Sequence, residues 1–133
     1  MKRQCVTCLD SMLLIAKPSG FLIGMAGGAA IWLLSPVLAG RFEPWDAGFY
    51  YPVALLVAGL LGGWAAPTHM GRVALGIFLG QGLILLGGVI ADPGSGALWP
   101  LGIVFLGIYS VVALFGAAIG AAITRHRAAS RPD

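Results

Sequence analysis

Charged residues in this chain fall into small groups that are separated by long uncharged stretches. Four stretches hold 23, 25, 19 and 32 residues, and they lie between Lys17 and Arg41, Asp46 and Arg72, Arg72 and Asp92, and Asp92 and Arg125. A helix needs roughly 20 mainly apolar residues to cross the hydrocarbon core of a bilayer. The spacing of the charges therefore predicts four transmembrane helices.

The composition excludes the main classes of water-soluble protein. Of the 133 residues, 59% are hydrophobic and only 10% are charged, and the mean hydropathy is +0.92. A soluble domain carries about 25% charged residues, so this chain has too few charges to cover a water-facing surface. Runs such as Val73–Leu79 do not alternate between apolar and polar residues as the strands of a membrane barrel do. The predicted fold class is therefore an all-α integral membrane protein.

The short loops between the apolar stretches predict an up-and-down bundle of four transmembrane helices, in which consecutive helices are antiparallel neighbours. We expect an N-terminal tail over residues 1–20, a transmembrane domain over 21–124 and a basic C-terminal tail over 125–133. The expected spans are Phe21–Ala39, Phe49–Ala66, Val73–Ala91 and Leu98–Thr124.

The N-terminal tail has apolar residues at helical spacing, namely Cys5, Leu9, Met12, Leu13 and Ala16. This pattern predicts a short amphipathic helix at the inner membrane surface, with a frayed tail as the alternative. Cys5 and Cys8 have the spacing of half a zinc site, but a structural zinc site takes four ligands and the chain has no second pair. We therefore expect reduced cysteines and no metal, with a metal shared between chains as the alternative.

Basic residues are distributed very unequally between the two predicted sides of the membrane. One side holds seven of the eight, which are Lys2, Arg3, Lys17, Arg72, Arg125, Arg127 and Arg131. The other side holds Arg41 together with Glu43, Asp46 and Asp92. Because cytoplasmic loops carry the excess of Lys and Arg, we expect a multi-pass protein of the bacterial inner membrane with both termini in the cytoplasm.

Glycine is unusually frequent, with 21 residues or about 16% of the chain, against an average near 7%. Many glycines are four residues apart, and the predicted helix-packing set is Gly24, Gly28, Gly59, Gly63, Gly76, Gly80, Gly116 and Gly120. Small residues at this spacing let helix backbones approach closely in lipid. The stripes either pack the four helices together or face outward to bind a partner helix.

The glycine pattern also contains a weak internal repeat. A shift of 52 residues places Gly24 and Gly28 on Gly76 and Gly80, and a shift of 48 residues places Tyr51 on Trp99 and Gly59 on Gly107. Two similar helical hairpins would produce this repeat, and a chance match between glycine-rich helices is the alternative.

Few polar side chains lie inside the predicted spans. Gln81 lies roughly 12 Å into the bilayer, counted at 1.5 Å per residue from the inner end of its helix. An amide that faced lipid would be costly, so Gln81 is expected to point into the bundle. Together with Tyr109 and Ser110 it forms the candidate intramembrane polar site, which either bonds helices together or lines a path for a solute.

Aromatic residues gather around the first outer loop, where Trp45 is followed by Phe49, Tyr50 and Tyr51. Trp and Tyr favour the level of the lipid headgroups. We expect this group to anchor the protein at the membrane interface, with Trp99 as the matching anchor of the second outer loop.

The sequence holds no set of residues that suits catalysis. His69 is expected on the inner side, whereas the carboxylates lie on the outer side, so acid, base and nucleophile cannot meet. We therefore expect no catalytic residues and no cofactor. We also expect no nucleic-acid partner, because the basic C-terminal tail suits anionic lipid.

These expectations lead to a hypothesis about function. The chain is a non-catalytic membrane protein that acts through glycine-mediated helix packing, as an accessory or assembly subunit bound to other transmembrane helices or as a homo-oligomer. The alternative is a small channel or transporter with a polar path near Gln81.

Overall fold

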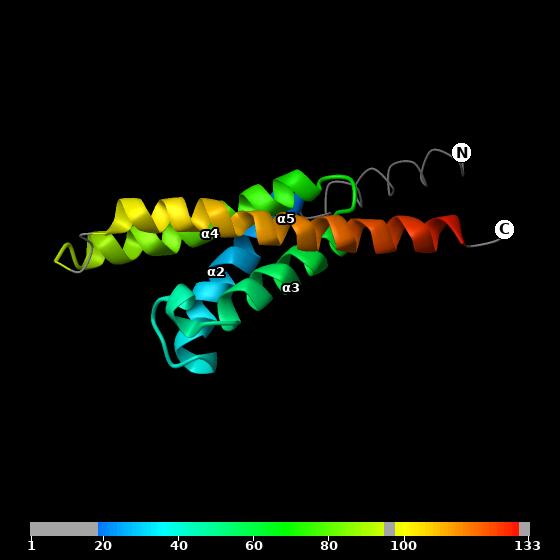
Figure 1. The fold of residues 1–133 in the computed structure, drawn as a ribbon. Helices are drawn as coiled ribbons and strands as arrows, with labels where there is room; N and C mark the ends of the chain where they lie inside the picture. The colour runs from blue at the N-terminus through cyan, green and yellow to red at the C-terminus, as the bar shows by residue number, and fades with distance from the viewer. Residues whose placement is uncertain (1–18, 95–97, 131–133) are drawn as a thin grey trace, which may run out of the picture.

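The computed structural model describes residues 19–94 and 98–130, and this part of the chain is helical and contains no strand. Its elements are α2 (Gly20–Leu38), the short 3-10 helix η1 (Pro44–Ala47), α3 (Tyr50–Ala65), α4 (Met70–Ala91) and α5 (Trp99–Ala129) (Figure 1). The helices begin and end within a few residues of the predicted spans, except that α5 continues to Ala129. The expected N-terminal amphipathic segment, with Cys5 and Cys8, lies outside the described residues.

Three of the helices, α2, α4 and α5, are long and apolar enough to cross a membrane. The fourth, α3, has 16 residues, which corresponds to about 24 Å at 1.5 Å per residue and is shorter than a bilayer core of about 30 Å. Large apolar side chains such as Leu33, Val37 and Leu61 are exposed on the outside of the structure. Long apolar helices with an apolar exterior indicate a membrane protein.

Local chemistry explains the ends of α2. At its start, the Ser19 hydroxyl accepts a hydrogen bond from the Leu22 amide at 3.4 Å, which satisfies one of the free N–H groups of the first turn. Near the end of the helix, the Ser35 hydroxyl donates a hydrogen bond to the carbonyl oxygen of Arg41, which lies beyond the helix, at 2.8 Å. The chain reverses through Gly40, whose φ of +66° is favourable for glycine and rare for other residues.

The four long helices form two antiparallel hairpins, α2–α3 and α4–α5 (Figure 1). The hairpins meet near the α3–α4 connection, which we call the joined end. They diverge toward η1 and toward the turn that follows Asp92, which we call the loop end. Arg125 ties the joined end together, because its Nη2 donates to the carbonyl oxygen of Pro67 at 3.0 Å.

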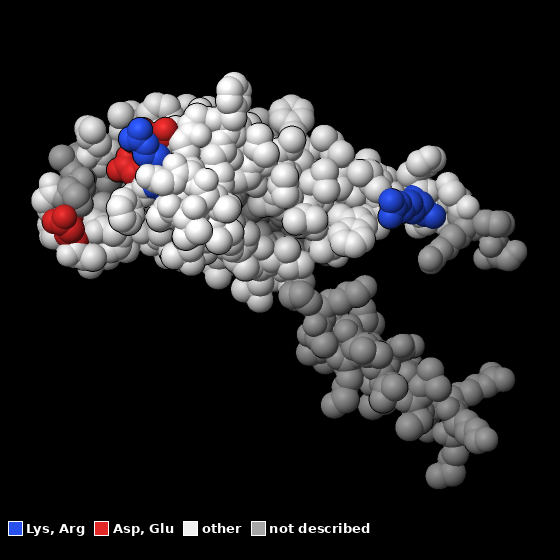
Figure 2. Space-filling view, turned by 90° about the horizontal axis from the view of Figure 1, so that it is seen from below, with Lys and Arg blue, Asp and Glu red and all other residues white. Residues whose placement is uncertain are grey.

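Charged side chains gather at the two ends of the molecule. Figure 2 shows the acidic side chains at one end, with one basic group beside them, and further basic side chains at the opposite end. The acids are Glu43, Asp46 and Asp92, which belong to the loop end. Arg125 and Arg127 lie in the last turns of α5, so the first part of the expected C-terminal tail is helical and not a free tail.

Helices α2 and α4 pack through backbone contacts at glycine. A Cβ atom at Gly24 would lie 2.9 Å from the carbonyl carbon of Val73 and closer still to its oxygen. Four glycines contact backbone in this way: Gly24 meets Val73, Gly28 meets Ile77, Gly76 meets Phe21 and Gly80 meets Met25. We call this set the α2–α4 clasp, and within it no side chain separates the two backbones.

Helices α3 and α5 pack in the same manner. A Cβ atom at Gly63 would lie 2.6 Å from the carbonyl carbon of Ala117. The four contacts of this α3–α5 clasp join Gly59 to Ala113, Gly63 to Ala117, Gly116 to Leu56 and Gly120 to Leu60. Residue numbers rise together along both partners, so the two helices of each clasp run parallel.

The contacts within each clasp are reciprocal. Gly24 meets Val73 while Gly76 meets Phe21, and both pairs are related by the same shift of 52 residues. The α3–α5 contacts are related by a shift of 57 residues, as in Gly59 and Gly116. Such reciprocity is the signature of a twofold interface. The two hairpins therefore pack on one another like the subunits of a dimer.

This arrangement corrects one detail of the expected bundle. Consecutive helices were expected to be the nearest neighbours, but the most extensive contacts join alternate helices, α2 with α4 and α3 with α5. Consecutive helices are antiparallel as expected, although α3 and α4 contact each other little. The reason is that close backbone contact requires a glycine stripe on both helices. The stripe of each helix faces the alternate helix in the other hairpin.

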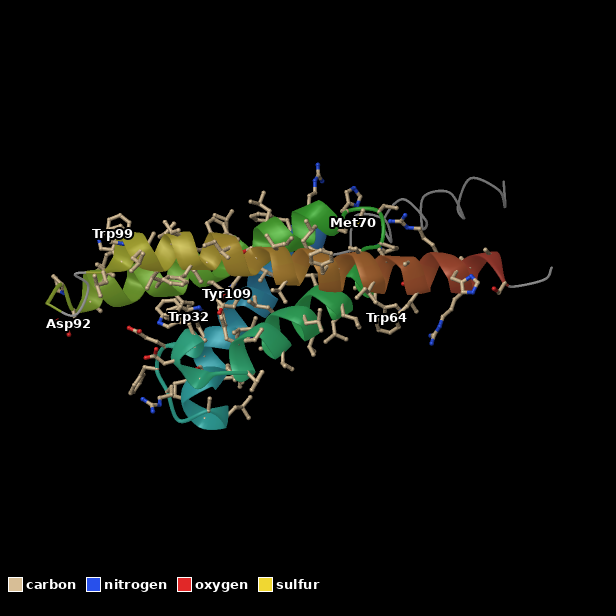
Figure 3. All side chains as sticks on the ribbon, viewed as in Figure 1. Trp32, Trp64, Met70, Asp92, Trp99 and Tyr109 are labelled. Carbon is tan, nitrogen blue, oxygen red and sulfur yellow. The ribbon has the colours of Figure 1, made fainter. Side chains whose placement is uncertain are left out.

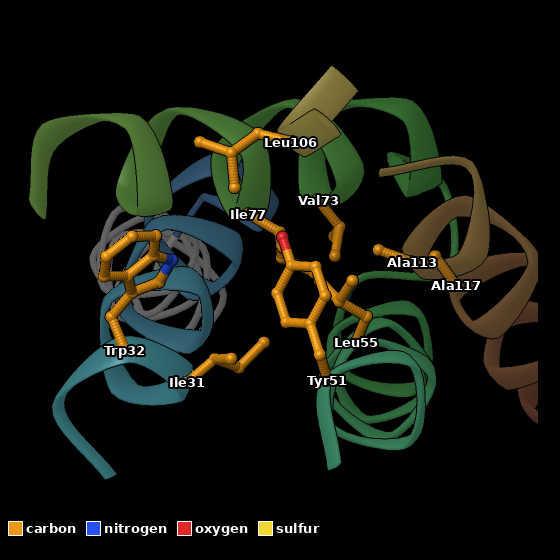
Figure 4. Close-up of a cluster of buried hydrophobic side chains, with 9 residues drawn as sticks. All are labelled: Ile31, Trp32, Tyr51, Leu55, Val73, Ile77, Leu106, Ala113 and Ala117. Atoms are coloured by element: carbon orange, nitrogen blue, oxygen red, sulfur yellow. The ribbon is translucent and has the colours of Figure 1, made fainter. Parts of the chain in front are cut away.

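A single hydrophobic core lies where the four helices meet. It consists of Ile31 and Trp32 from α2, Tyr51 and Leu55 from α3, Val73 and Ile77 from α4, and Leu106, Ala113 and Ala117 from α5 (Figure 4). The aromatic members Trp32 and Tyr51 lie toward the loop end, whereas Val73, Ile77 and the two alanines lie in the clasps. The size of the side chains thus changes along the molecule.

Candidate functional site: a cavity between the hairpins

Gln81 is completely buried in the centre of the structure. Its Oε1 accepts a hydrogen bond from the Tyr51 hydroxyl at 2.6 Å, and its Nε2 donates to the Ile77 carbonyl oxygen of its own helix at 3.3 Å. The amide therefore joins α4 to α3 across the two hairpins. It points inward, and its oxygen is bonded to a side chain.

The other two residues of the candidate polar site have different surroundings. The ring of Tyr109 lies against the ring of Tyr51, with 4.9 Å between the centroids. The Ser110 hydroxyl donates to the Leu106 carbonyl oxygen at 2.6 Å, within α5 itself. The structure thus connects Gln81 and Tyr109 through Tyr51, and it leaves Ser110 apart. We call the connected set the Tyr51–Gln81–Tyr109 layer.

Tyr51 is the central residue that the sequence reasoning missed. It was assigned to the interface anchor, yet only 1% of its surface is exposed, whereas Phe49 is 88% exposed and fits the expected anchor position. The signal was available in the helical spacing. Tyr51 lies four residues before Leu55 and eight before Gly59, so it shares a face with the glycine stripe of α3.

A cavity of about 920 Å³ lies on the loop-end side of this layer, between the two hairpins. Its volume is within the range of small-molecule binding sites. Its lining includes six aromatic residues, which are Trp32, Phe42, Trp45, Trp99, Phe105 and Tyr109. Aliphatic side chains of α4 and α5, with the glycines Gly88 and Gly102, complete the wall.

The aromatic rings form a connected series from the cavity wall to the buried layer. Trp32 and Trp45 meet edge to face, with centroids 5.1 Å apart and planes at 81°. Trp45 in turn meets Tyr51 at 6.5 Å and 84°. Figure 3 shows Trp32 and Tyr109 close together between the hairpins, and Trp99 toward the loop end. Trp45 therefore belongs to the cavity wall as well as to the expected interface anchor.

Two polar groups of the lining stand out. Glu43 is the single carboxylate in it, and the Trp45 Nε1 donates to its Oε2 at 2.9 Å, which holds the carboxylate beside the cavity. Only 9% of Trp32 is exposed, and its Nε1 is a buried donor without a hydrogen-bond partner among the described residues. A buried donor without a partner costs free energy of desolvation; this nitrogen is enclosed by the protein, so Trp32 lines the cavity with its ring.

The cavity does not continue toward the joined end as a path near Gln81. The residues that line it include Tyr109 but neither Gln81 nor Ser110. Beyond the layer, the two clasps bring the backbones into contact and leave no room for a solute. The cavity is therefore a pocket with one closed end.

A second hollow lies on the other face of the α2–α3 hairpin. It has a volume of about 760 Å³, and it is lined by apolar residues, several of them small, including Gly27, Ala30, Ala54 and Ala58. In the part of the chain that the structure describes, His, Cys, Asp and Glu form no group of three that could hold a metal ion. The cavity between the hairpins offers apolar and aromatic contacts and one carboxylate.

Comparison of the chain with protein-family models, curated proteins and solved structures finds no match. The function is therefore argued from the cavity and its residues.

Proposed function

We propose that this chain is a four-span protein of the bacterial inner membrane that works without catalysis and binds one amphiphilic molecule between its two hairpins. The observation that carries the proposal is the aromatic-lined cavity of about 920 Å³, which is open on one side and closed by the Tyr51–Gln81–Tyr109 layer. Ligand sites are concave and mainly apolar with a few placed polar groups, and Glu43 supplies such a group here.

The proposed topology places both termini in the cytoplasm and the loop end on the outer side. The described basic residues other than Arg41 lie toward the joined end, and the acids lie at the loop end, which is the distribution of a protein that follows the positive-inside rule. In this orientation the cavity opens at the level of the outer leaflet, where a lipid-like molecule can enter from the side.

A filling variant tests the binding proposal. Gly88 lines the cavity, whereas its neighbour Gly87 does not, and a Cβ atom at either position would meet nothing within 4 Å. The chain is purified in mild detergent, and bound lipid is counted by native mass spectrometry. We expect one retained lipid for the wild type and for Gly87→Phe, and loss of it for Gly88→Phe. Equal retention by all three proteins would contradict the proposal.

We propose the role of accessory subunit or homo-oligomer as a second candidate. The eight predicted packing glycines contact helices of the same chain, so they do not supply an outward stripe. The observation in favour of this role is the apolar hollow on the α2–α3 hairpin, where Gly27, Ala30, Ala54 and Ala58 would admit a helix closely.

A mass measurement on the complex from native membranes tests this second role. We expect Ala54→Trp to release the partner and Ala118→Trp, on the exposed side of α5, to retain it. A wild-type chain that is a monomer in mild detergent would exclude it.

A further inference from the structure

The charged and aromatic side chains of the cavity between the hairpins indicate which head group its ligand carries. Among the described residues, the loop end carries three carboxylates, Glu43, Asp46 and Asp92, and one basic side chain, Arg41. Of these four only Glu43 lines the cavity. An anionic head group would therefore meet a carboxylate of like charge, whereas a cationic one would be attracted to it.

The aromatic lining favours an ammonium group in particular. A cation placed over the face of Trp or Tyr is attracted by the ring quadrupole, and Trp gives the strongest attraction. Trp32, Trp45, Trp99 and Tyr109 all line the cavity, and Trp45 also fixes the Glu43 carboxylate through its 2.9 Å hydrogen bond. An ammonium here would gain both ring and carboxylate contacts.

The apolar wall indicates a second property of the ligand. Leu85, Leu101 and Phe105 line the cavity, and their side chains offer contacts to a hydrocarbon chain. A ligand that satisfies both parts of the cavity carries an ammonium head group and an acyl chain. An ethanolamine phospholipid has both.

We propose that the ligand of the cavity is an ethanolamine phospholipid of the surrounding bilayer. The ammonium lies against the Trp rings and Glu43, and an acyl chain lies along the apolar wall at Leu85, Leu101 and Phe105. This assignment rests on the proposed function, because it names the amphiphile that the same cavity binds.

Competition between two lipids tests the assignment. The purified chain is mixed with vesicles that contain equal amounts of phosphatidylethanolamine and phosphatidylglycerol, and the bound lipids are weighed by native mass spectrometry. We expect phosphatidylethanolamine to exceed phosphatidylglycerol by about fivefold, the ratio that a modest cation–π and charge contact supplies. A ratio near one, or an excess of phosphatidylglycerol, would overturn the assignment and leave the binding proposal standing.

Two variants identify the groups responsible. Glu43→Gln should lower the lipid ratio to nearly one while total binding persists, whereas Asp46→Asn, in the same loop but outside the lining, should keep the fivefold ratio.

The outcomes of these experiments test the ammonium assignment and the proposed binding function separately. An unchanged ratio in Glu43→Gln, or equal losses in Glu43→Gln and Asp46→Asn, would overturn the ammonium assignment. Absence of any bound lipid in the wild type would instead overturn the proposed function. A thermal unfolding midpoint equal to that of the wild type shows for each variant that the fold is intact.

Discussion

At the joined end, the two hairpins touch through backbone, and at the loop end they are held apart by bulky rings. Gly63 of α3 and Gly80 of α4 leave no space for even a methyl group. Trp32 and Trp45 stand edge to face between the diverging ends. The same pair of hairpins is therefore closed or open according to the size of the side chains between them.

The comparison shows how a small membrane protein can fold and still keep a cavity. In lipid, helices associate through close packing because the hydrophobic effect adds little. The clasps supply this packing in one half of the molecule. The other half then does not need to be filled by side chains, and it can hold a ligand.

Replacement of a clasp glycine by leucine should destabilise the protein more than any other change considered below. Gly80→Leu and Gly116→Leu place a large side chain where the backbone of Met25 or Leu56 lies. We expect each to cost about 3 kcal/mol or more in the free energy of unfolding, because neither backbone can move away without opening a clasp. Thermal unfolding in detergent measures the loss.

Gly107→Leu is the matched control for the leucine variants. Gly107 is exposed on α5, and a Cβ there would meet nothing within 4 Å, so the variant should unfold at or above the wild-type temperature, because leucine is favoured over glycine within a helix. A loss as large as that of Gly116→Leu would mean that the clasp is not the cause.

Removal of an aromatic ring tests the open half. Trp45→Ala deletes the ring that contacts both Trp32 and Tyr51, and we expect a cost of about 2 kcal/mol, less than the 3–5 kcal/mol of a fully buried ring. Phe49→Ala, at an 88% exposed position, should change the stability by less than about 0.5 kcal/mol. Equal costs would mean that both residues are interface anchors, as the sequence suggested. Chemical unfolding curves in detergent compare the two.

Loss of the hydrogen bond between Tyr51 and Gln81, which lies between the closed and the open half, should have a smaller effect on stability. Gln81→Leu and Tyr51→Phe each remove one side of the 2.6 Å hydrogen bond, and each should cost about 1 kcal/mol because a buried polar partner is left unpaired. The double variant should cost less than the sum of the two single losses, by a coupling near the 0.6 kcal/mol average for membrane bundles. Additive losses in the double variant would show that the two groups do not interact.

Helix positions and the glycine stripes could be predicted from the sequence because both depend on local spacing. Long uncharged stretches located the four helices, and the shift of 52 residues that relates Gly24 to Gly76 recurs in the contacts of the α2–α4 clasp. For α3 and α5 the expected shift of 48 residues, which placed Gly59 on Gly107, is wrong, because the contacts relate Gly59 to Gly116 by a shift of 57. A stripe shows which face of a helix packs closely, but not which helix it meets, so the pairing of alternate helices was missed.

The candidate site could be predicted only in part. Gln81 was expected to point inward and bond, and the structure places it so. Its partner Tyr51 was assigned to the membrane interface because aromatic residues near a loop are usually found there. The cavity depends on how far the hairpins diverge, and that distance follows from tertiary contacts such as Trp32 on Trp45. A linear pattern does not contain this information.

The central claim is that backbone contact at glycine holds the two hairpins together, and alanine substitution tests it through the sign of the effect. Alanine is favoured over glycine within a helix by about 0.5–1 kcal/mol, so Gly87→Ala and Gly107→Ala, where a Cβ meets nothing within 4 Å, should raise the unfolding temperature. Gly80→Ala and Gly116→Ala, where a Cβ would overlap a carbonyl, should lower it. Opposite signs in these two pairs are the predicted result, and a rise in all four variants would contradict the claim.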